Sequence, residues 1–145
     1  MTRFSAALAL ALAASPALAD DDYIPPVTHA ATQEECGACH MAYQPGLLPA
    51  RSWSAIMGDL ANHFGENADL DEATRAEIEA YLVSGAARRT RSIPADETPL
   101  RISELPWFKH EHDHEVSQRM RDRAKTMSNC VACHRGADRG YYEDD

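Results

Sequence analysis

All four cysteines of this chain fall in two copies of one five-residue pattern. The copies are Cys36-Gly37-Ala38-Cys39-His40 and Cys130-Val131-Ala132-Cys133-His134. A C-x-x-C-H sequence is the attachment site of c-type haem. The two thiols form thioethers with the vinyl groups of one porphyrin, and the histidine that follows becomes the proximal ligand of the iron. The sequence therefore predicts two covalently bound haems. Their attachment residues are Cys36, Cys39, Cys130 and Cys133, and their proximal ligands are His40 and His134.

Other uses of paired cysteines fit the chain less well. A four-cysteine zinc site uses two C-x-x-C pairs, but here about ninety residues separate the pairs and a histidine follows each without a role. Disulfides form in exported proteins, yet they do not explain two C-x-x-C-H copies. A thioredoxin-like motif requires a βαβ context, which is absent from the sequence pattern. Haem attachment is the interpretation that uses every residue of both motifs.

The first nineteen residues have the pattern of a secretory signal peptide. A basic start with Arg3 precedes an Ala/Leu run that ends in Ala17-Leu18-Ala19, and these are the three regions of such a leader. The run is shorter than the roughly 20 apolar residues of a spanning helix, and no later segment is long enough. We therefore expect cleavage after Ala19 and a mature protein in the periplasm, where haem c is attached. A retained anchor is the alternative.

The charge balance restricts the class of partner. The chain has 23 acidic and 14 basic residues, for a net charge of −9. Loss of the leader removes one arginine and makes the mature chain more acidic. Nucleic acid is a poor partner for such a surface. A redox protein with a basic patch is a better one, because complementary charge speeds encounter.

Hydrophobic spacing predicts helices and no strand, so the expected fold class is all-α. One helix is expected over residues 52–64, where Trp53, Met57, Leu60 and Phe64 recur at helical spacing before Gly65. A second should begin near residue 69 or 71 and end at residue 84. A third is expected from residue 107 to about residue 129. The expected organisation is a first haem-binding half at 20–85, a connector at 86–100 and a second haem-binding half at 101–145.

The sixth ligand of each iron determines what the protein can do, because an open position allows substrates to bind. For the first haem we predict His63, which lies beside apolar residues of the first expected helix; Met57 is its rival. For the second haem, His112 lies on the apolar stripe of the third expected helix, which is completed by Phe108, Val116, Met120, Ala124 and Met127. His110 and His114 lie on the opposite, polar side. We predict His112, with His114 as the alternative.

With these residues assigned, the chain resembles a known family, the small periplasmic dihaem cytochromes c called DHC. The resemblance begins at Glu35-Cys36-Gly37-Ala38-Cys39-His40-Met41-Ala42-Tyr43 and includes residues 47–53, 63–65, 101–108 and 129–140. It implies two low-spin haems with two histidine ligands each, in two mainly helical halves. It also implies electron transfer with a high-spin c-type cytochrome or a membrane cytochrome b as partner. Where the family has one histidine after the Trp-Phe pair, this chain has three, and distance from Trp107 assigns the role to His112.

Two hypotheses of function follow. In the first, the chain is an electron carrier and not an enzyme, with His40 and His63 on one iron and His134 and His112 on the other. A closed iron changes oxidation state with little rearrangement of its ligands. In the alternative, one haem loses its sixth ligand, and the chain is a dihaem peroxidase or a small-ligand reductase.

Overall fold

Helices form the described part of the chain, as the hydrophobic spacing predicts. The computed structural model describes residues 23–88 and 93–143. In these ranges it contains the α-helices α1 (Ala30–Gly37), α2 (Ala50–Met57), α3 (Glu72–Ser84), α4 (Pro106–His112) and α5 (Gln118–Ala124). Short 3₁₀ helices lie between and after them: η1 (Pro45–Leu47), η2 (Leu60–Asn62), η3 (Ile102–Glu104), η4 (Cys130–Ala132) and η5 (Ala137–Arg139). Strand-like pairing within these ranges is limited to two isolated bridges, so the all-α prediction is confirmed.

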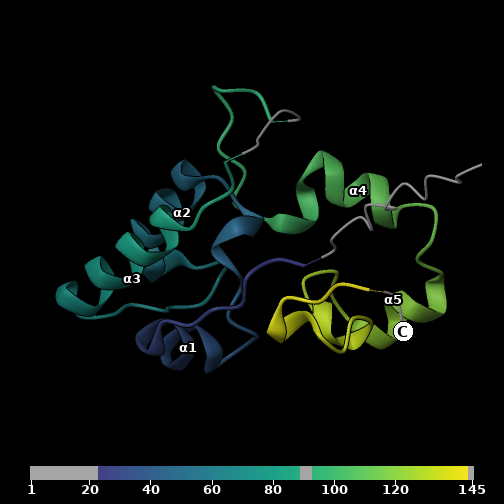
Figure 1. The fold of residues 1–145 in the computed structure, drawn as a ribbon, viewed down its shortest axis with the longest axis horizontal. Coiled ribbons are helices and arrows are strands. Elements are labelled where there is room, and N and C mark those ends of the chain that lie inside the picture. Colours follow the sequence, from purple (N-terminus) through teal and green to yellow (C-terminus); the bar gives the residue numbers. More distant parts are fainter. Residues whose placement is uncertain (1–22, 89–92, 144–145) are drawn as a thin grey trace, which may run out of the picture.

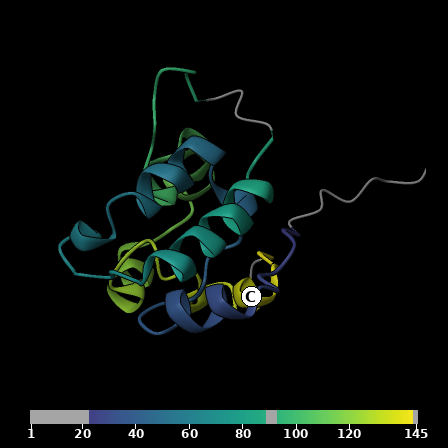
Figure 2. The ribbon, with the colours of Figure 1, turned by 90° about the vertical axis from the view of Figure 1, so that its left-hand side faces the viewer.

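The helices are arranged in two groups (Figure 1). Helices α1, α2 and α3 lie together on one side, while α4 and α5 lie on the other. Helix α3 contacts both α1 and α2, as Figure 2 also shows. The end of the described chain returns to its beginning, because the backbone amide of Ile24 donates to the carbonyl of Gly140 at 2.8 Å. No helix in the described ranges is both long and apolar enough to cross a membrane.

One hydrophobic core joins the two groups of helices. Helices α2 and α3 supply half of its buried residues, and Leu105 and Phe108 add to it from the start of α4. The buried residues of this core cluster are Leu48, Trp53, Met57, Leu60, Ile78, Leu82, Leu105 and Phe108. Ile78 is fully buried. The core therefore links α4 directly to the elements that follow the first C-x-x-C-H motif.

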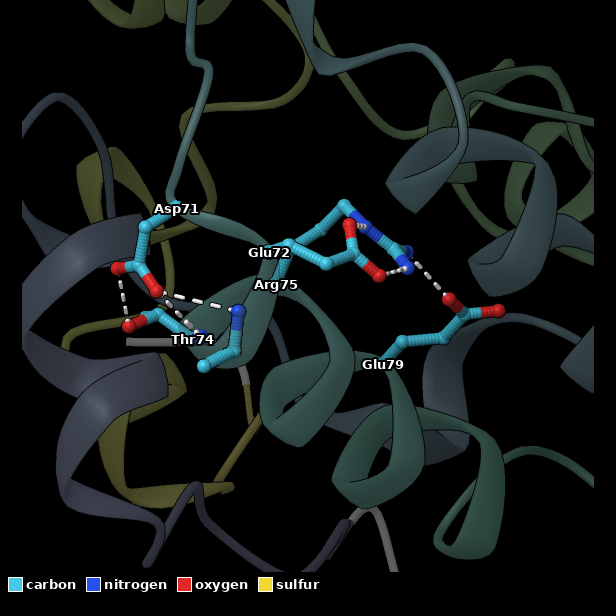
Figure 3. A network of polar contacts seen from close by, with 6 residues as sticks. Asp71, Glu72, Thr74, Arg75 and Glu79 are labelled. Carbon is cyan, nitrogen blue, oxygen red and sulfur yellow. Dashed lines mark hydrogen bonds and ion pairs between the residues drawn. The ribbon is translucent and has the colours of Figure 1, made fainter.

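Helix α3 has well-defined ends. The side chain of Asp71 accepts from the backbone amides of Ala73 and Thr74 (Figure 3), which is the bond pattern of an N-cap. Arg75 forms ion pairs with two glutamates of the same helix: its Nη2 lies 2.7 Å from Oε1 of Glu72, and its Nη1 lies 2.6 Å from Oε2 of Glu79. The helix ends at Gly85. The predicted helix is thus confirmed with its later start, after Asp71.

The helix predicted over residues 52–64 is wrong in extent. Helix α2 ends at Met57 with Gly58 as its C-cap, and the chain continues as η2. Glycine loses more conformational entropy in a helix than other residues, and Asp59 directly after it has φ −141°. His63 therefore follows a short 3₁₀ turn and does not share a helix with Met57.

The single helix predicted from residue 107 to residue 129 is also wrong. Helix α4 ends at His112, and α5 begins after Ser117, whose hydroxyl accepts from the backbone amide of Met120. A serine that caps a new helix competes with continuation of the previous one. Lys125 then ends α5 with φ +67°. The predicted apolar stripe is consequently not one face of one helix.

Parts of the sequence predictions lie outside the described residues. These are the leader at 1–19 and residues 89–92 of the predicted connector.

Candidate haem-binding sites

The first C-x-x-C-H motif lies at the end of α1. Cys36 belongs to the helix, while Cys39 and His40 follow it and are exposed. Burial, and to a lesser degree the charge of Glu35, raises the pKa of the Cys36 thiol. All four cysteines of the chain are described and carry free thiols. Each motif therefore keeps both of its thiols available for thioether bonds.

Helix α1 is fixed to α3 by another histidine. His29 is the N-cap of α1, and its Nδ1 lies 2.9 Å from Oγ1 of Thr32. Its Nε2 lies 2.9 Å from Oε1 of Glu77, and its ring packs on Tyr81 with the centres 4.8 Å apart. Because both ring nitrogens have partners, His29 serves as a structural link and not as an iron ligand.

The structure brings His63 to the proximal histidine of the first motif. The ring centres of His40 and His63 are 6.2 Å apart, with 22° between the ring planes. Two imidazoles on opposite sides of one metal, each with a bond of about 2 Å, have ring centres about 6 Å apart. Burial lowers the pKa of His63, and the neighbouring His40 and Arg101 lower it further. The neutral imidazole, which is the form that binds a metal, is thereby favoured.

A tight turn presents His63. The residue is the C-cap of η2, and its carbonyl accepts from the amide of Glu66 at 3.1 Å. Phe64 and Gly65 both have positive φ, at +54° and +105°. Gly65 has open space around its α-carbon, so the backbone angle and not crowding requires glycine here.

The second motif forms a compact turn. Cys130 begins η4, and its carbonyl accepts from the backbone amide of His134 at 2.8 Å. Burial raises the pKa of the Cys130 thiol. Nδ1 of His134 lies 3.3 Å from the carbonyl oxygen of Glu143. Asn129 connects this turn to α5 by donating to the carbonyl of Ala124 at 3.1 Å.

His112 faces this second proximal histidine. The ring centres of His112 and His134 are 6.1 Å apart, and the ring planes are at 82°. Nδ1 of His112 lies 2.8 Å from the carbonyl oxygen of Phe108. The rings of His112 and Phe108 also stack, with their centres 3.9 Å apart and 7° between the ring planes. The alternatives His110 and His114 are exposed.

Met57, the alternative distal ligand for the first haem, lies in the hydrophobic core. The side chain of Met57 is buried in the core with 3% exposure. In the described ranges, no three His, Cys, Asp or Glu side chains converge as a metal site needs, so the two cysteine pairs do not form one zinc site. The donor set of free thiol pairs and facing imidazole pairs instead fits two c-type haems.

The sequence does not predict the aromatic residues that surround these histidines. Tyr43 packs on His40 with ring centres 4.9 Å apart, and Tyr142 packs on His134 at 5.8 Å. Phe108 was predicted as part of an apolar stripe, but its stacking on His112 was not. A tyrosine three residues after the first motif was the available signal, although its partner could not be read from the sequence.

Comparisons with known proteins agree with this geometry. The dihaem cytochrome c family, DHC, matches residues 32–142. A diheme cytochrome c from Rhodobacter sphaeroides is 57% identical, with 81% of this chain and 99% of that chain covered and a TM-score of 0.78. A second structure, of DHC purified from Rhodobacter sphaeroides, is 60% identical, with 80% and 98% covered and a TM-score of 0.73.

A more distant structure extends the comparison. The diheme cytochrome type c from Shewanella baltica OS155 is 42% identical, with 79% of this chain and 86% of that chain covered and a TM-score of 0.68. No curated protein matches the chain. The match over residues 32–142 includes both C-x-x-C-H motifs. The chain therefore belongs to the dihaem cytochrome c family and binds two c-type haems.

Proposed function

We propose that this protein is an electron carrier in which each haem iron is bound by two histidines. Membership of the dihaem cytochrome c family implies electron transfer through haem. The proposal adds the ligands: His40 and His63 for the first iron, His134 and His112 for the second. The bound haems would supply the one-electron chemistry, and the chain would supply attachment, ligands and orientation.

The observation that supports this proposal most is the pair of imidazole separations, 6.2 and 6.1 Å. Each pair combines a motif histidine with one from a distant segment. In His40 and His112, Nδ1 lies 2.8 Å from a backbone carbonyl. Such a bond selects the tautomer whose Nε2 can bind a metal and fixes the plane of the ring. Two closed irons favour a carrier over the alternative of a dihaem enzyme with an open iron.

Carbon monoxide tests the ligand assignment. The wild-type ferrous protein should stay low-spin and should not bind carbon monoxide at either haem. His63→Ala and His112→Ala, made separately, should each open one haem. His110→Ala and His114→Ala are matched controls from the same segment and should leave both haems closed. A wild-type haem that binds carbon monoxide would exclude the closed carrier, and opening by His114→Ala but not by His112→Ala would reassign the second ligand.

Location and partners form the remaining part of the proposal. The pattern of residues 1–19 supports export to the periplasm with cleavage after Ala19. Net charge −9 supports a redox partner with a basic docking surface, such as the high-spin c-type cytochrome or membrane cytochrome b that the family resemblance implies. The division into halves at 20–85 and 101–145 also stays a prediction. The intact mass of protein recovered from the periplasm tests cleavage after Ala19, because a chain that still contains residues 1–19 would contradict it; absence of the protein from the periplasm would contradict export.

A further inference from the structure

Tyr43 and Gln44, three and four residues after the first C-x-x-C-H motif, contact the surroundings of the second motif. The hydroxyl of Tyr43 donates to the carbonyl of Ser128 at 2.6 Å. Ser128 precedes Cys130 by two residues, and it is 85 residues away from Tyr43 in sequence. The ring of Tyr43 packs on His40, with centres 4.9 Å apart and 28° between the planes. One side chain therefore contacts the proximal ligand of the first site and the backbone of the second.

Gln44 adds a second connection. Its side chain is fully buried, and its Nε2 donates to the carbonyl of Ala137 at 2.6 Å. Its Oε1 accepts from the hydroxyl of Tyr142 at 2.5 Å. The ring of Tyr142 in turn lies edge-on to His134, with centres 5.8 Å apart. Both polar ends of a buried amide are thus satisfied by the segment that follows the second motif.

Both tyrosine hydroxyls donate to oxygen acceptors across the two sites. Tyr43 donates to the carbonyl of Ser128, and Tyr142 donates to Oε1 of Gln44. The two bonds connect the segment after the first motif to residues on both sides of the second.

We propose that Tyr43, Gln44 and Tyr142 form a bridge that fixes the two haem sites relative to each other and sets the rate at which an electron passes between them. The inference rests on the proposed carrier function and extends it. In the exchange, one electron leaves the ferrous iron of one haem and reduces the ferric iron of the other. Neither tyrosine is oxidised, and neither gains or loses a proton. The three are positioning residues, which act through the ligands His40 and His134.

The test is the rate of electron exchange between haems in the holoprotein, measured after photoreduction of half of the haems. Tyr43→Leu removes both the ring and the hydrogen bond, and Tyr142→Phe removes only the bond to Gln44. Each should slow exchange by a factor of about three or more, since loss of one hydrogen bond of ordinary net strength changes the population of the aligned arrangement by roughly that factor. Tyr141→Phe is the matched control. Its ring packs on Tyr23 and not on a ligand, so exchange should keep the wild-type rate.

Each outcome separates the bridge from the proposed function. Exchange at the wild-type rate in both bridge variants, with both haems still closed to carbon monoxide, would overturn the bridge and leave the bis-histidine carrier intact. A wild-type haem open to carbon monoxide would instead refute the carrier. If Tyr43→Leu fails to fold, the double variant Tyr43→Phe, Tyr142→Phe keeps both rings, and its exchange rate decides the question. Slow exchange with unchanged absorption spectra and midpoint potentials would support the bridge.

Discussion

Arg101 lies beside the proposed distal ligand of the first haem, and its positive charge should raise the reduction potential of that haem. The guanidinium carbon is 4.0 Å from the centre of the Phe64 ring, and that ring is 4.9 Å from the His63 ring. Oxidised haem iron has one more positive charge than reduced iron. Replacement of Arg101 by glutamine should therefore stabilise the oxidised form and lower the potential.

The geometry gives the size of this effect. The separations of 4.0 and 4.9 Å put the guanidinium within about 9 Å of the His63 ring centre. We therefore take the distance between the guanidinium charge and the iron as about 10 Å. At that distance, two unit charges interact by roughly 0.4 kcal/mol in water and roughly 1.7 kcal/mol at an effective dielectric constant of about 20. Arg101 is 47% exposed and its Nε is 3.5 Å from Glu104, which favours the lower half of this range. A shift of about 20–40 mV follows for a one-electron couple.

A redox titration at low ionic strength, monitored by electron paramagnetic resonance, measures the shift at each haem separately. Arg101→Gln should lower one midpoint potential by about 20–40 mV, and Arg101→Lys should change it little because the charge remains. Glu104→Gln removes the counter-charge and should move the same midpoint in the opposite direction. The shifts should shrink in salt as the Debye length falls below about 10 Å. An unchanged potential in Arg101→Gln, or an equal shift in Arg101→Lys, would refute the electrostatic reasoning.

Other predictions concern the ligand planes, the core and the chain ends. The ring planes are at 22° in the His40–His63 pair and at 82° in the His112–His134 pair. The oxidised protein should therefore give two different low-spin electron paramagnetic resonance signals, because parallel imidazoles split the iron d orbitals more than perpendicular ones. Two identical signals would contradict this geometry. Ile78→Ala should lower the free energy of unfolding by about 2–5 kcal/mol and Ile78→Val by about 0.5–1.5 kcal/mol in denaturant titrations. Gly140→Ala should lower the melting temperature, because Gly140 has φ +89° and an added β-carbon would clash with the carbonyl oxygen of Ile24. An unchanged melting temperature would contradict this prediction. Hydrogen bonds from Thr74 lower the pKa of the Asp71 carboxyl. The contribution of Asp71 to folding stability is therefore fully present above the unfolded pKa of about 3.9, and it is lost as the pH falls through the lower pKa of the folded state. Asp71→Ala should accordingly be less stable than wild type at pH 7, with the difference vanishing in acid.

The parts of the fold that the sequence predicted are those determined by local chemistry. Helix α3 begins after Asp71 because a carboxylate there accepts two backbone amides, and its ends are visible in the residue types. The other predicted helices were extended too far. Apolar spacing continues through Gly58 and through Ser117, but backbone entropy at the first and capping at the second divide the helices. Periodicity alone does not show which of two competing local interactions prevails.

The haem sites divide in the same way. The attachment cysteines and proximal histidines belong to a contiguous pattern, so their identification needs no tertiary structure. The apolar stripe that predicts His112 spans a helix that the structure divides in two, yet His112 is the histidine that faces His134. The reason is that its place within α4 still follows Phe108 by one turn, and only the C-terminal continuation of the stripe was incorrect. The bridge of Tyr43, Gln44 and Tyr142 could not have been predicted, since its bonds join residues 85 to 98 positions apart.

The two proposed distal histidines are held by different physical means, and this makes the two sites unequal. His63 lies on a turn with two consecutive positive φ angles and has the exposed Phe64 beside it. His112 is stacked on Phe108, which is itself part of the core shared with α2 and α3. A disturbance of the turn at His63 can stay local, whereas displacement of His112 must also move a buried aromatic ring. The hydrophobic core therefore contributes directly to the position of His112, the proposed distal ligand of the second haem, while the position of His63 depends on backbone conformation.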